Sequence, residues 1–440
     1  MTNRGTIKGP TVIRLDSWKA IAAHLDRSSR TVQRWHARHG LPVIHLAGKK
    51  SSVFAYPEEL DNWFASRGAI TKVEPKEAAE PELLHTLPTF RMRISKQEEP
   101  IHTLIPESER KRSAELAASA NRMWEVLSAR NLTTISGYFR EAIDLDHGNA
   151  PAFAGLSFVL IVQGLYGIIC TSIAYIAAKA AADRALEIDT DLPAAKCAAA
   201  WIKMISQRDW QGASVDFEDA LSRQAADCCA LTGRAVLRIA ENRLEKASQF
   251  LLDAEAKAPL SSFAAALYCW NEYLKNEFEK SLYQINQVRA SGRSGPVMNA
   301  VEALAYLQLE ERDARIDRLK VLAAASPHNQ VVQGTLGCAF ARANMPQEAG
   351  KLLKSMTETE SRGKGCEPYA VAIILIGLND KKKAVERLEQ SYREGSLWSL
   401  GFRSDPVLAP LRKEPSFQQF LRKVDYPEPR DTLAHSTASD

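Results

Sequence analysis

Apolar residues follow a helical spacing near the start of the chain. Four of them occupy the i, i+3, i+4 and i+7 positions of one helix face: Trp18, Ile21, Ala22 and Leu25. Asp16 or Ser17 precedes this face and can cap the helix. After a polar turn, Ser29 can cap a second helix in which Val32 and Trp35 are three residues apart. The spacing therefore predicts two short helices that pack through these faces.

The pattern then changes from helical to strand-like and back. Residues 53–56 follow a polar turn at residues 47–52 and alternate as a strand does, which predicts a two-stranded hairpin. Pro57 starts a last helix. This helix directs three apolar residues inward: Leu60, Trp63 and Phe64. The order helix, helix, hairpin, helix over residues 11–67 predicts a small winged helix-turn-helix domain.

Basic side chains gather on the second helix and the hairpin turn of this domain. Lysine and arginine outnumber aspartate and glutamate over residues 11–67. Arg and Gln can read base edges in the major groove, and Lys and Arg can neutralise phosphates. We therefore predict that the domain binds duplex DNA. The predicted contact residues are Arg27, Ser29, Arg30, Thr31, Gln33, Arg34, Arg38, Lys49 and Lys50.

This domain resembles the excisionase/MerR-type helix-turn-helix family in the segments SWKAIAAHL, RTVQRW, GLP and VFAYPEELDNW. The resemblance implies that the helix around Arg30 and Gln33 enters the major groove. It also implies that Lys49 and Lys50 contact the phosphate backbone. MerR regulators usually add a coiled coil for dimerisation, and no such pattern follows here.

Two segments have the composition of disordered chain. Residues 68–110 contain recurrent prolines among charged residues and few aromatics, which predicts an extended linker. Residues 425–440 are similar and predict a disordered tail. The linker separates the N-terminal domain from a long body over residues 111–424.

The body is internally repetitive. Residues 139–156 and 182–200 each end one helix with an A-[IL]-x-[IL]-D run and open the next with small residues. Both resemble the junction between tetratricopeptide repeats. The matching positions are Ala142, Ile143, Leu145, Asp146, Ala150, Ala152, Gly155 and Leu156, then Ala185, Leu186, Ile188, Asp189 and Ala194. Later junctions are predicted near Pro259, Pro296, Pro327 and Pro368.

The expected fold is therefore mainly α, with the small winged domain followed by an α-solenoid of tetratricopeptide-like helix pairs. Residues 384–424 resemble the segment that closes such arrays in bacterial signalling proteins. The concave groove, lined by the first helix of each pair, is the expected binding surface for a protein or peptide. A second copy of the chain is another candidate partner, because the N-terminal domain lacks a dimerisation helix.

Composition and motifs bound the remaining possibilities. A net charge of +4 over 440 residues is small, so the basicity must act locally. The start of the chain lacks the apolar core of a signal peptide. Residues 158–178 are long and apolar enough to suggest a membrane span. Gly164 and Gly167 interrupt them, however, and favour a buried helical hairpin over a span. We expect a cytoplasmic protein without a membrane segment.

The sequence contains none of the common catalytic motifs, such as a P-loop, a nucleophile elbow or HExxH. His36 and His39 have a spacing that could bind a metal, but no cysteine lies near them. The seven cysteines are scattered and are expected to be buried free thiols. We therefore expect no enzyme activity, cofactor or metal. The favoured function is DNA-binding transcriptional regulation with a protein-binding or oligomerising array. The alternative is a scaffold whose small domain binds protein rather than DNA.

Overall fold

The computed structural model divides the chain into two compact units, Met1–Glu80 and Pro81–Asp440. The structure describes residues 15, 17–24, 32–33, 36, 41–45, 53–55, 60, 105–125, 131–223, 227–309, 312–361, 366–424 and 426–427.

In the N-terminal unit, a short helix lies beside a small antiparallel sheet. The helix is α1 (Trp18–His24), and the Ser17 Oγ caps it by accepting a hydrogen bond from the backbone N–H of Ala20 at 3.0 Å. Strand β1 (Ile44–His45) pairs with β2 (Val53–Phe54). An isolated antiparallel bridge joins Leu15 to Ala55. The strand pair lies where the sequence predicts a hairpin.

One apolar core unites the described parts of this unit. It contains Ile21, Ala22, Val32, Leu41, Val43, Val53, Ala55 and Leu60, with Trp18 partly buried against them. These residues come from both predicted helices, the hairpin and the last predicted helix. Leu25, Trp35 and Trp63, which the sequence also places inward, lie outside the described residues.

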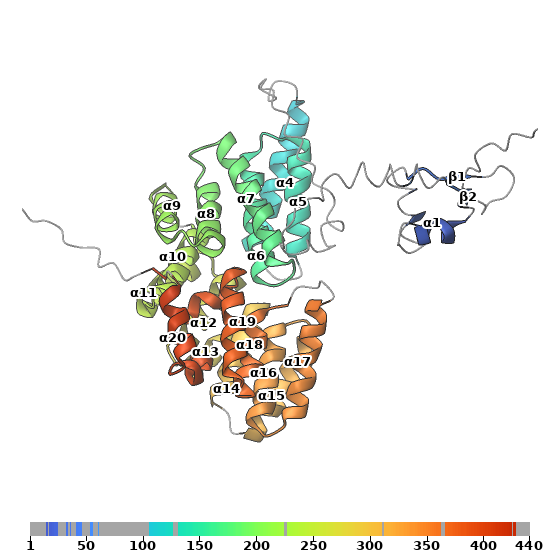
Figure 1. Cartoon of the computed structure of the whole chain (residues 1–440). Coiled ribbons are helices and arrows are strands. Elements are labelled where there is room, and N and C mark those ends of the chain that lie inside the picture. Colours follow the sequence, from blue (N-terminus) through green and yellow to red (C-terminus); the bar gives the residue numbers. More distant parts are fainter. Residues whose placement is uncertain are drawn as a thin grey trace, which may run out of the picture. The chain divides into compact units, whose positions relative to one another are not determined.

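The second unit is built from helices (Figure 1). The first of them are α4 (Glu107–Glu125), α5 (Leu132–Leu145), α6 (Ala150–Leu165), α7 (Thr171–Ile188), α8 (Pro193–Ile202), the π-helix η3 (Lys203–Gln207) and α9 (Trp210–Arg223). Those that follow are α10 (Cys228–Ala240), α11 (Leu244–Lys257), α12 (Ser262–Leu274), α13 (Phe278–Ala290), α14 (Pro296–Leu309), α15 (Arg312–Ala325), α16 (Gln330–Arg342), α17 (Pro346–Ser361), α18 (Pro368–Gly377) and α19 (Lys381–Arg393). After α19 come the 3-10 helices η4 (Leu397–Gly401) and η5 (Pro406–Leu411) and the helix α20 (Pro415–Lys423).

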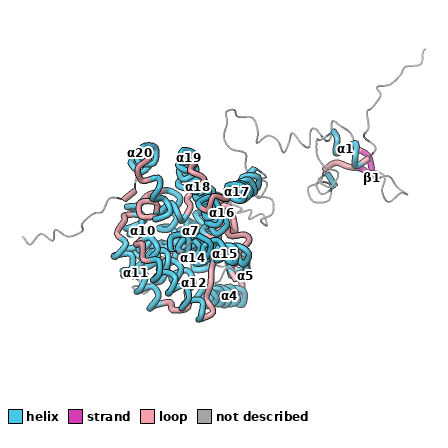
Figure 2. Tube along the Cα trace, turned by 90° about the horizontal axis from the view of Figure 1, so that it is seen from below, coloured by secondary structure: helices cyan, strands magenta, loops and turns pink. Residues whose placement is uncertain are grey.

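The helices form pairs in two layers. Each even-numbered helix from α4 to α18 contacts the next even-numbered helix, so these first helices of the pairs make a continuous layer. The odd-numbered second helices, α5 to α19, each pack against the first helices before and after them. Figures 1 and 2 show the pairs following one another along the chain. The second unit is thus mainly helical and repetitive, as the sequence predicts.

The two layers differ in their patterns of burial. Every residue of the first helix α12 is buried. The second helix α11 buries only one stripe, at Ala247, Ser248, Leu251 and Ala254. A helix that is apolar on all sides must be covered on all sides, whereas a striped helix covers a surface. In this pair the first helix therefore lies inside and the second helix outside, whereas α4, which begins the array, is mostly exposed.

Asparagine makes the turn between the two helices of several pairs. Four asparagines adopt a positive φ of 58–65° at this place: Asn242, Asn276, Asn344 and Asn379. The residue after each one bonds back to a carbonyl five positions earlier, as in Asp380 N–H to Leu375 O at 2.9 Å. This is the Schellman ending of a helix, in which asparagine can replace glycine.

The junctions between pairs fall where the prolines predict them. Pro296 and Pro368 are the first residues of α14 and α18. Pro259 and Pro327 lie between the helices of successive pairs. These four predictions are confirmed. Proline marks such junctions because it lacks the backbone N–H that a continuing helix would need.

The apolar stretch over residues 158–178 forms a helical hairpin. Helix α6 ends at Leu165, Gly167 turns the chain with a φ of +67°, and α7 begins at Thr171. The hairpin prediction is confirmed. Across the described parts of the chain, no helix combines the length and the apolar character needed to cross a membrane.

Both ends of the repetitive body differ slightly from the expected boundaries. Helix α4 begins at Glu107, inside the predicted linker. Tyr426, inside the predicted tail, is buried, and its hydroxyl donates to the Ser399 carbonyl. The Tyr426 ring also meets Trp210 and Tyr392, at centroid distances of 6.3 and 5.7 Å.

Candidate functional site

Residues 395–426, which we call the closing segment, fold back onto the first-helix layer. Within this segment η4 contacts α10, and η5 contacts α14 and α18. Residues 273 and 369, which belong to first helices far apart in the chain, meet the same few residues of the segment.

One carboxylate joins two of these first helices. Asp405 is 1% exposed, and its two oxygens accept hydrogen bonds from the Tyr273 hydroxyl of α12 at 2.8 Å and the Tyr369 hydroxyl of α18 at 2.5 Å. Burial raises the pKa of Asp405, although the two tyrosine hydroxyls oppose that rise. The carboxylate therefore depends on both hydroxyls to replace its lost hydration.

Aromatic rings surround this carboxylate. The Trp398 ring stacks on Tyr369 with a centroid distance of 5.5 Å and meets Trp270 edge-on at 5.7 Å. Phe402 stacks on Tyr369 at 5.9 Å. Offset and edge-on rings at these distances stabilise a core beyond the area they bury.

The closing segment and the end of α19 also reach the early helices. Arg208 follows the π-helix η3 with a φ of 57°, and its Nη2 donates to the Tyr392 carbonyl at 2.7 Å and to the Ser399 Oγ at 3.0 Å. The Tyr175 hydroxyl of α7 donates to the Gly395 carbonyl at 3.1 Å. The array is therefore closed by contacts between its early and late helices.

These contacts correct one expectation from the sequence. The first-helix face was expected to form an open concave groove for a protein or peptide. The chain's own closing segment instead covers part of that face, at α10, α12, α14 and α18. The physical reason is that η4 and η5 are too apolar to remain in water, with Leu397, Leu400, Val407 and Leu408 all buried.

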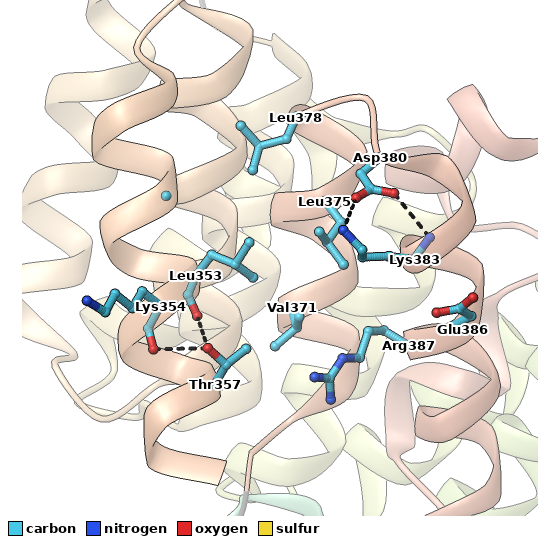
Figure 3. A pocket seen from close by; sticks show the side chains of 11 residues that line it. Leu353, Lys354, Thr357, Val371, Leu375, Leu378, Asp380, Lys383, Glu386 and Arg387 are labelled. Carbon is cyan, nitrogen blue, oxygen red and sulfur yellow. Dashed lines mark hydrogen bonds and ion pairs between the residues drawn. The ribbon is translucent and has the colours of Figure 1, made fainter. Parts of the chain in front are cut away.

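An open groove lies elsewhere, between α17 and α19 (Figure 3). This α17–α19 groove has a volume of about 580 Å³. Its lining residues are Gly350, Leu353, Lys354, Thr357, Val371, Leu375, Leu378, Asp380, Lys383, Glu386 and Arg387.

The floor of the groove is apolar, and its α17 wall carries no side chain at Gly350. Val371 and Leu375 of α18 form the floor, and Leu353 of α17 is partly exposed beside them. At Gly350, in the same wall, an added Cβ would have no atom within 4 Å. The wall is open there because α17 packs only loosely against α18.

Charged side chains line the rest of the groove. Lys354 lies on the α17 wall, and Lys383 and Arg387 lie on the α19 wall (Figure 3). Arg387 pairs with Glu360 at 2.8 Å, and Lys383 pairs with Asp380 at 2.8 Å. The Lys383 ammonium holds the pKa of Asp380 below its usual value.

The predicted DNA contacts are only partly placed. Gln33 is described and is exposed, next to the buried Val32. The other predicted contacts lie outside the described residues: Arg27, Ser29, Arg30, Thr31, Arg34, Arg38, Lys49 and Lys50.

The histidines considered for metal binding and the cysteines lie among ordinary packing and backbone contacts. The Nδ1 of His36 lies 2.9 Å from the Leu41 carbonyl, and His39 is outside the described residues. All seven cysteines are free, and Cys197, Cys269 and Cys338 are buried. Burial raises the pKa of each of these three thiols, which keeps them protonated. In the described part of the chain, no group of His, Cys, Asp or Glu could hold a metal ion.

No family model matches the chain, and no curated protein matches it. Several solved structures align with part of the chain. The hetero-tetramer Cut9–Hcn1 of the APC/C aligns with a TM-score of 0.45 and 11% identity, covering 68% of this chain and 57% of that one. Yeast Tom70 aligns with a TM-score of 0.39 and 14% identity, covering 74% and 70%. A tetratricopeptide repeat protein from Parabacteroides merdae aligns with a TM-score of 0.30 and 12% identity, covering 67% and 99%. The helices of this chain are paired by their own contacts.

Proposed function

We propose that the chain is a non-catalytic scaffold whose helical array binds another protein. One observation carries this proposal: the α17–α19 groove stays open, although the closing segment covers part of the first-helix face. An array of helix pairs exposes a long surface because each pair packs mainly against its neighbours. The resemblance of residues 139–200 to tetratricopeptide junctions supports the same function.

Affinity purification of the intact chain from its own cells tests this proposal, with chemical crosslinking and mass spectrometry to locate contacts. We expect a protein that co-purifies in a fixed ratio and crosslinks to residues of α4 to α19. A second copy of the chain would meet the same criterion, and sedimentation of the purified protein would reveal it. Crosslinks confined to the N-terminal unit would contradict the proposal.

A second proposal concerns the N-terminal unit, which we infer binds duplex DNA. Three observations support it: the β1–β2 pair, the Leu15–Ala55 bridge beside it, and the exposure of Gln33 next to the buried Val32. Together they fit a helix with a polar outer face and a hairpin beside it, as a winged helix-turn-helix requires. With both proposals, the chain is a transcriptional regulator that joins DNA to a protein partner.

Binding of fluorescent duplexes to the intact chain tests the second proposal. Affinity should fall steeply with salt, since phosphate contacts release counterions. Gln33→Ala or Arg30→Ala should relax sequence preference by about 1–3 kcal/mol, whereas Lys49→Ala should weaken all duplexes alike. Absence of binding at low salt would leave the N-terminal unit as a protein-binding module.

A further inference from the structure

His36 connects three parts of the N-terminal unit. Its ring meets the Trp18 ring of α1 at a centroid distance of 5.7 Å, with 57° between the ring planes. Its Nδ1 lies 2.9 Å from the carbonyl oxygen of Leu41. Because a carbonyl only accepts, Nδ1 must carry the hydrogen of this bond. Leu41 is 1% exposed and stands three residues before β1, so the bond ends on backbone that is fixed in the core.

The helical stretch that carries His36 also carries Gln33. Residues 32, 33 and 36 are helical. Val32 stands one turn before His36 and is 0% exposed, whereas Gln33 stands three residues before it and is exposed. Residues three and four apart are neighbours on a helix surface, so half-buried His36 lies beside both. The side chain that anchors this stretch is therefore within one helical turn of its exposed glutamine.

The reading of a base by glutamine depends on how its helix is held. A glutamine amide pairs with adenine through two hydrogen bonds in the major groove, and both must be aligned together. Contacts from lysine and arginine to phosphates carry no sequence information and act mainly through charge. Apolar packing, as at Val32, has no preferred direction. The bond from His36 to Leu41 is directional, so it restrains a rotation that would turn Gln33 away from a base.

We propose that His36 is a positioning residue for sequence reading: its bond to Leu41 and its contact with Trp18 hold Gln33 where the amide meets one adenine of a duplex. His36 acts through Gln33 and needs no contact with DNA. Side chains that recognise a ligand must be held within about 0.5 Å by their supporting contacts, and directional bonds are lost first when that support is removed. This inference rests on the proposed DNA binding by the N-terminal unit and names the residue that supports its base contact.

Duplexes selected from a randomised library with the intact chain supply the preferred sequence, and a scrambled duplex supplies the nonspecific reference. His36→Phe keeps a ring beside Trp18 and removes the donor to Leu41. His36→Asn keeps a donor, because its amide nitrogen can take the place of Nδ1. His24→Phe is the matched control, since His24 is an exposed histidine of the same unit and ends α1.

We expect His36→Phe to lower the preference for the selected duplex over the scrambled one about tenfold, the effect of one lost base contact. Binding to the scrambled duplex and its salt dependence should stay unchanged, because the phosphate contacts remain. His36→Asn should recover most of the preference, and His24→Phe should leave it unaltered. His36→Phe and Gln33→Ala should lose discrimination at the same base pair, and the double variant should be no worse than Gln33→Ala alone.

A residue that only stabilises the fold would give a different pattern. Equal weakening of both duplexes, no change at all, an asparagine variant as poor as the phenylalanine variant, or loss at another base pair would overturn the inference. Each of these results would leave DNA binding by the unaltered chain intact. Failure of the unaltered chain to bind any duplex would instead remove the proposed DNA binding, and the role of His36 with it.

Discussion

The ring of Phe217 occupies the place where a side chain on Gly233 would begin. A Cβ at Gly233 would lie 2.3 Å from two atoms of that ring. Phe217 belongs to the second helix α9 and Gly233 to the following first helix α10. The same relationship occurs two helix pairs earlier in the chain, between Phe139 of α5 and Gly155 of α6, where the Cβ would lie 2.2 Å from the ring. A phenylalanine set against a glycine thus fixes how closely two neighbouring pairs approach.

Gly233→Ala should lower the free energy of unfolding by about 1–3 kcal/mol, because the added methyl overlaps the Phe217 ring. Gly350→Ala is the control, and it should raise stability by up to about 1 kcal/mol, since alanine favours the helix and meets nothing there. Urea unfolding measures both. Adding Phe217→Leu to Gly233→Ala should recover part of the loss. Equal shifts for the two glycine variants would refute this account of the packing.

Asp405→Ala should destabilise the second unit by at least about 2 kcal/mol, because the buried hydroxyls of Tyr273 and Tyr369 would lose their acceptor. Asp405→Asn keeps one acceptor oxygen and should cost less. Thermal unfolding of the two variants gives the comparison. If asparagine and alanine are equally harmful, the carboxylate does not act through these two hydroxyls.

Glu367→Gln should make the second unit more stable at alkaline pH. Burial raises the Glu367 pKa to about 7, while its Oε1 accepts the Tyr369 backbone N–H at 3.1 Å. A folded-state pKa above the unfolded value, about 4.3, gives stability that is present below that value and lost as pH rises through about 7. Glutamine mimics the neutral form, so its advantage should be absent near pH 4 and approach about 3 kcal/mol by pH 8. Melting temperatures that run parallel for both proteins across this range would exclude the effect.

Ending the chain at Glu394 should expose the first-helix face that the closing segment covers. Trp270 and Tyr369 would then lose their contacts with Trp398. Removing even one tryptophan from a core usually costs about 3–5 kcal/mol, so the shortened protein should bind a hydrophobic dye and aggregate. Trp398→Ala in the intact chain is the milder test. A shortened protein that remains monomeric and binds no dye would show that the segment is dispensable.

Local features of the sequence predict much of this fold. The prolines at Pro296 and Pro368 mark helix starts because their effect on the backbone does not depend on distant residues. The asparagine turns carry an equally local signal that periodicity alone misses. Asn242, Asn276 and Asn344 each stand a few residues before a second helix, in ENRLEKA, KNEFEKS and ANMPQEA.

Long-range contacts could not be predicted in this way. Tyr175 and Gly395 are separated by 220 positions, and nothing in either local sequence names the other. The α17–α19 groove was equally hidden. Leu353 has the same spacing within its helix as Leu251, so only the packing of the next pair distinguishes an exposed position from a buried one. The predicted DNA contacts around Arg30 and Lys49 remain predictions.

Tyr175 and Arg208 of the early helices form hydrogen bonds with Gly395 and Tyr392, so the first and last parts of the array stabilise each other. An open row of repeats can fray from either end, and its stability is a sum over neighbours. In this protein the early helices pack against the late ones, so neither end can unfold without breaking contacts with the other. Unfolding should then be all-or-none, and hydrogen exchange in α8 and α9 should slow when a partner occupies the distant groove between α17 and α19.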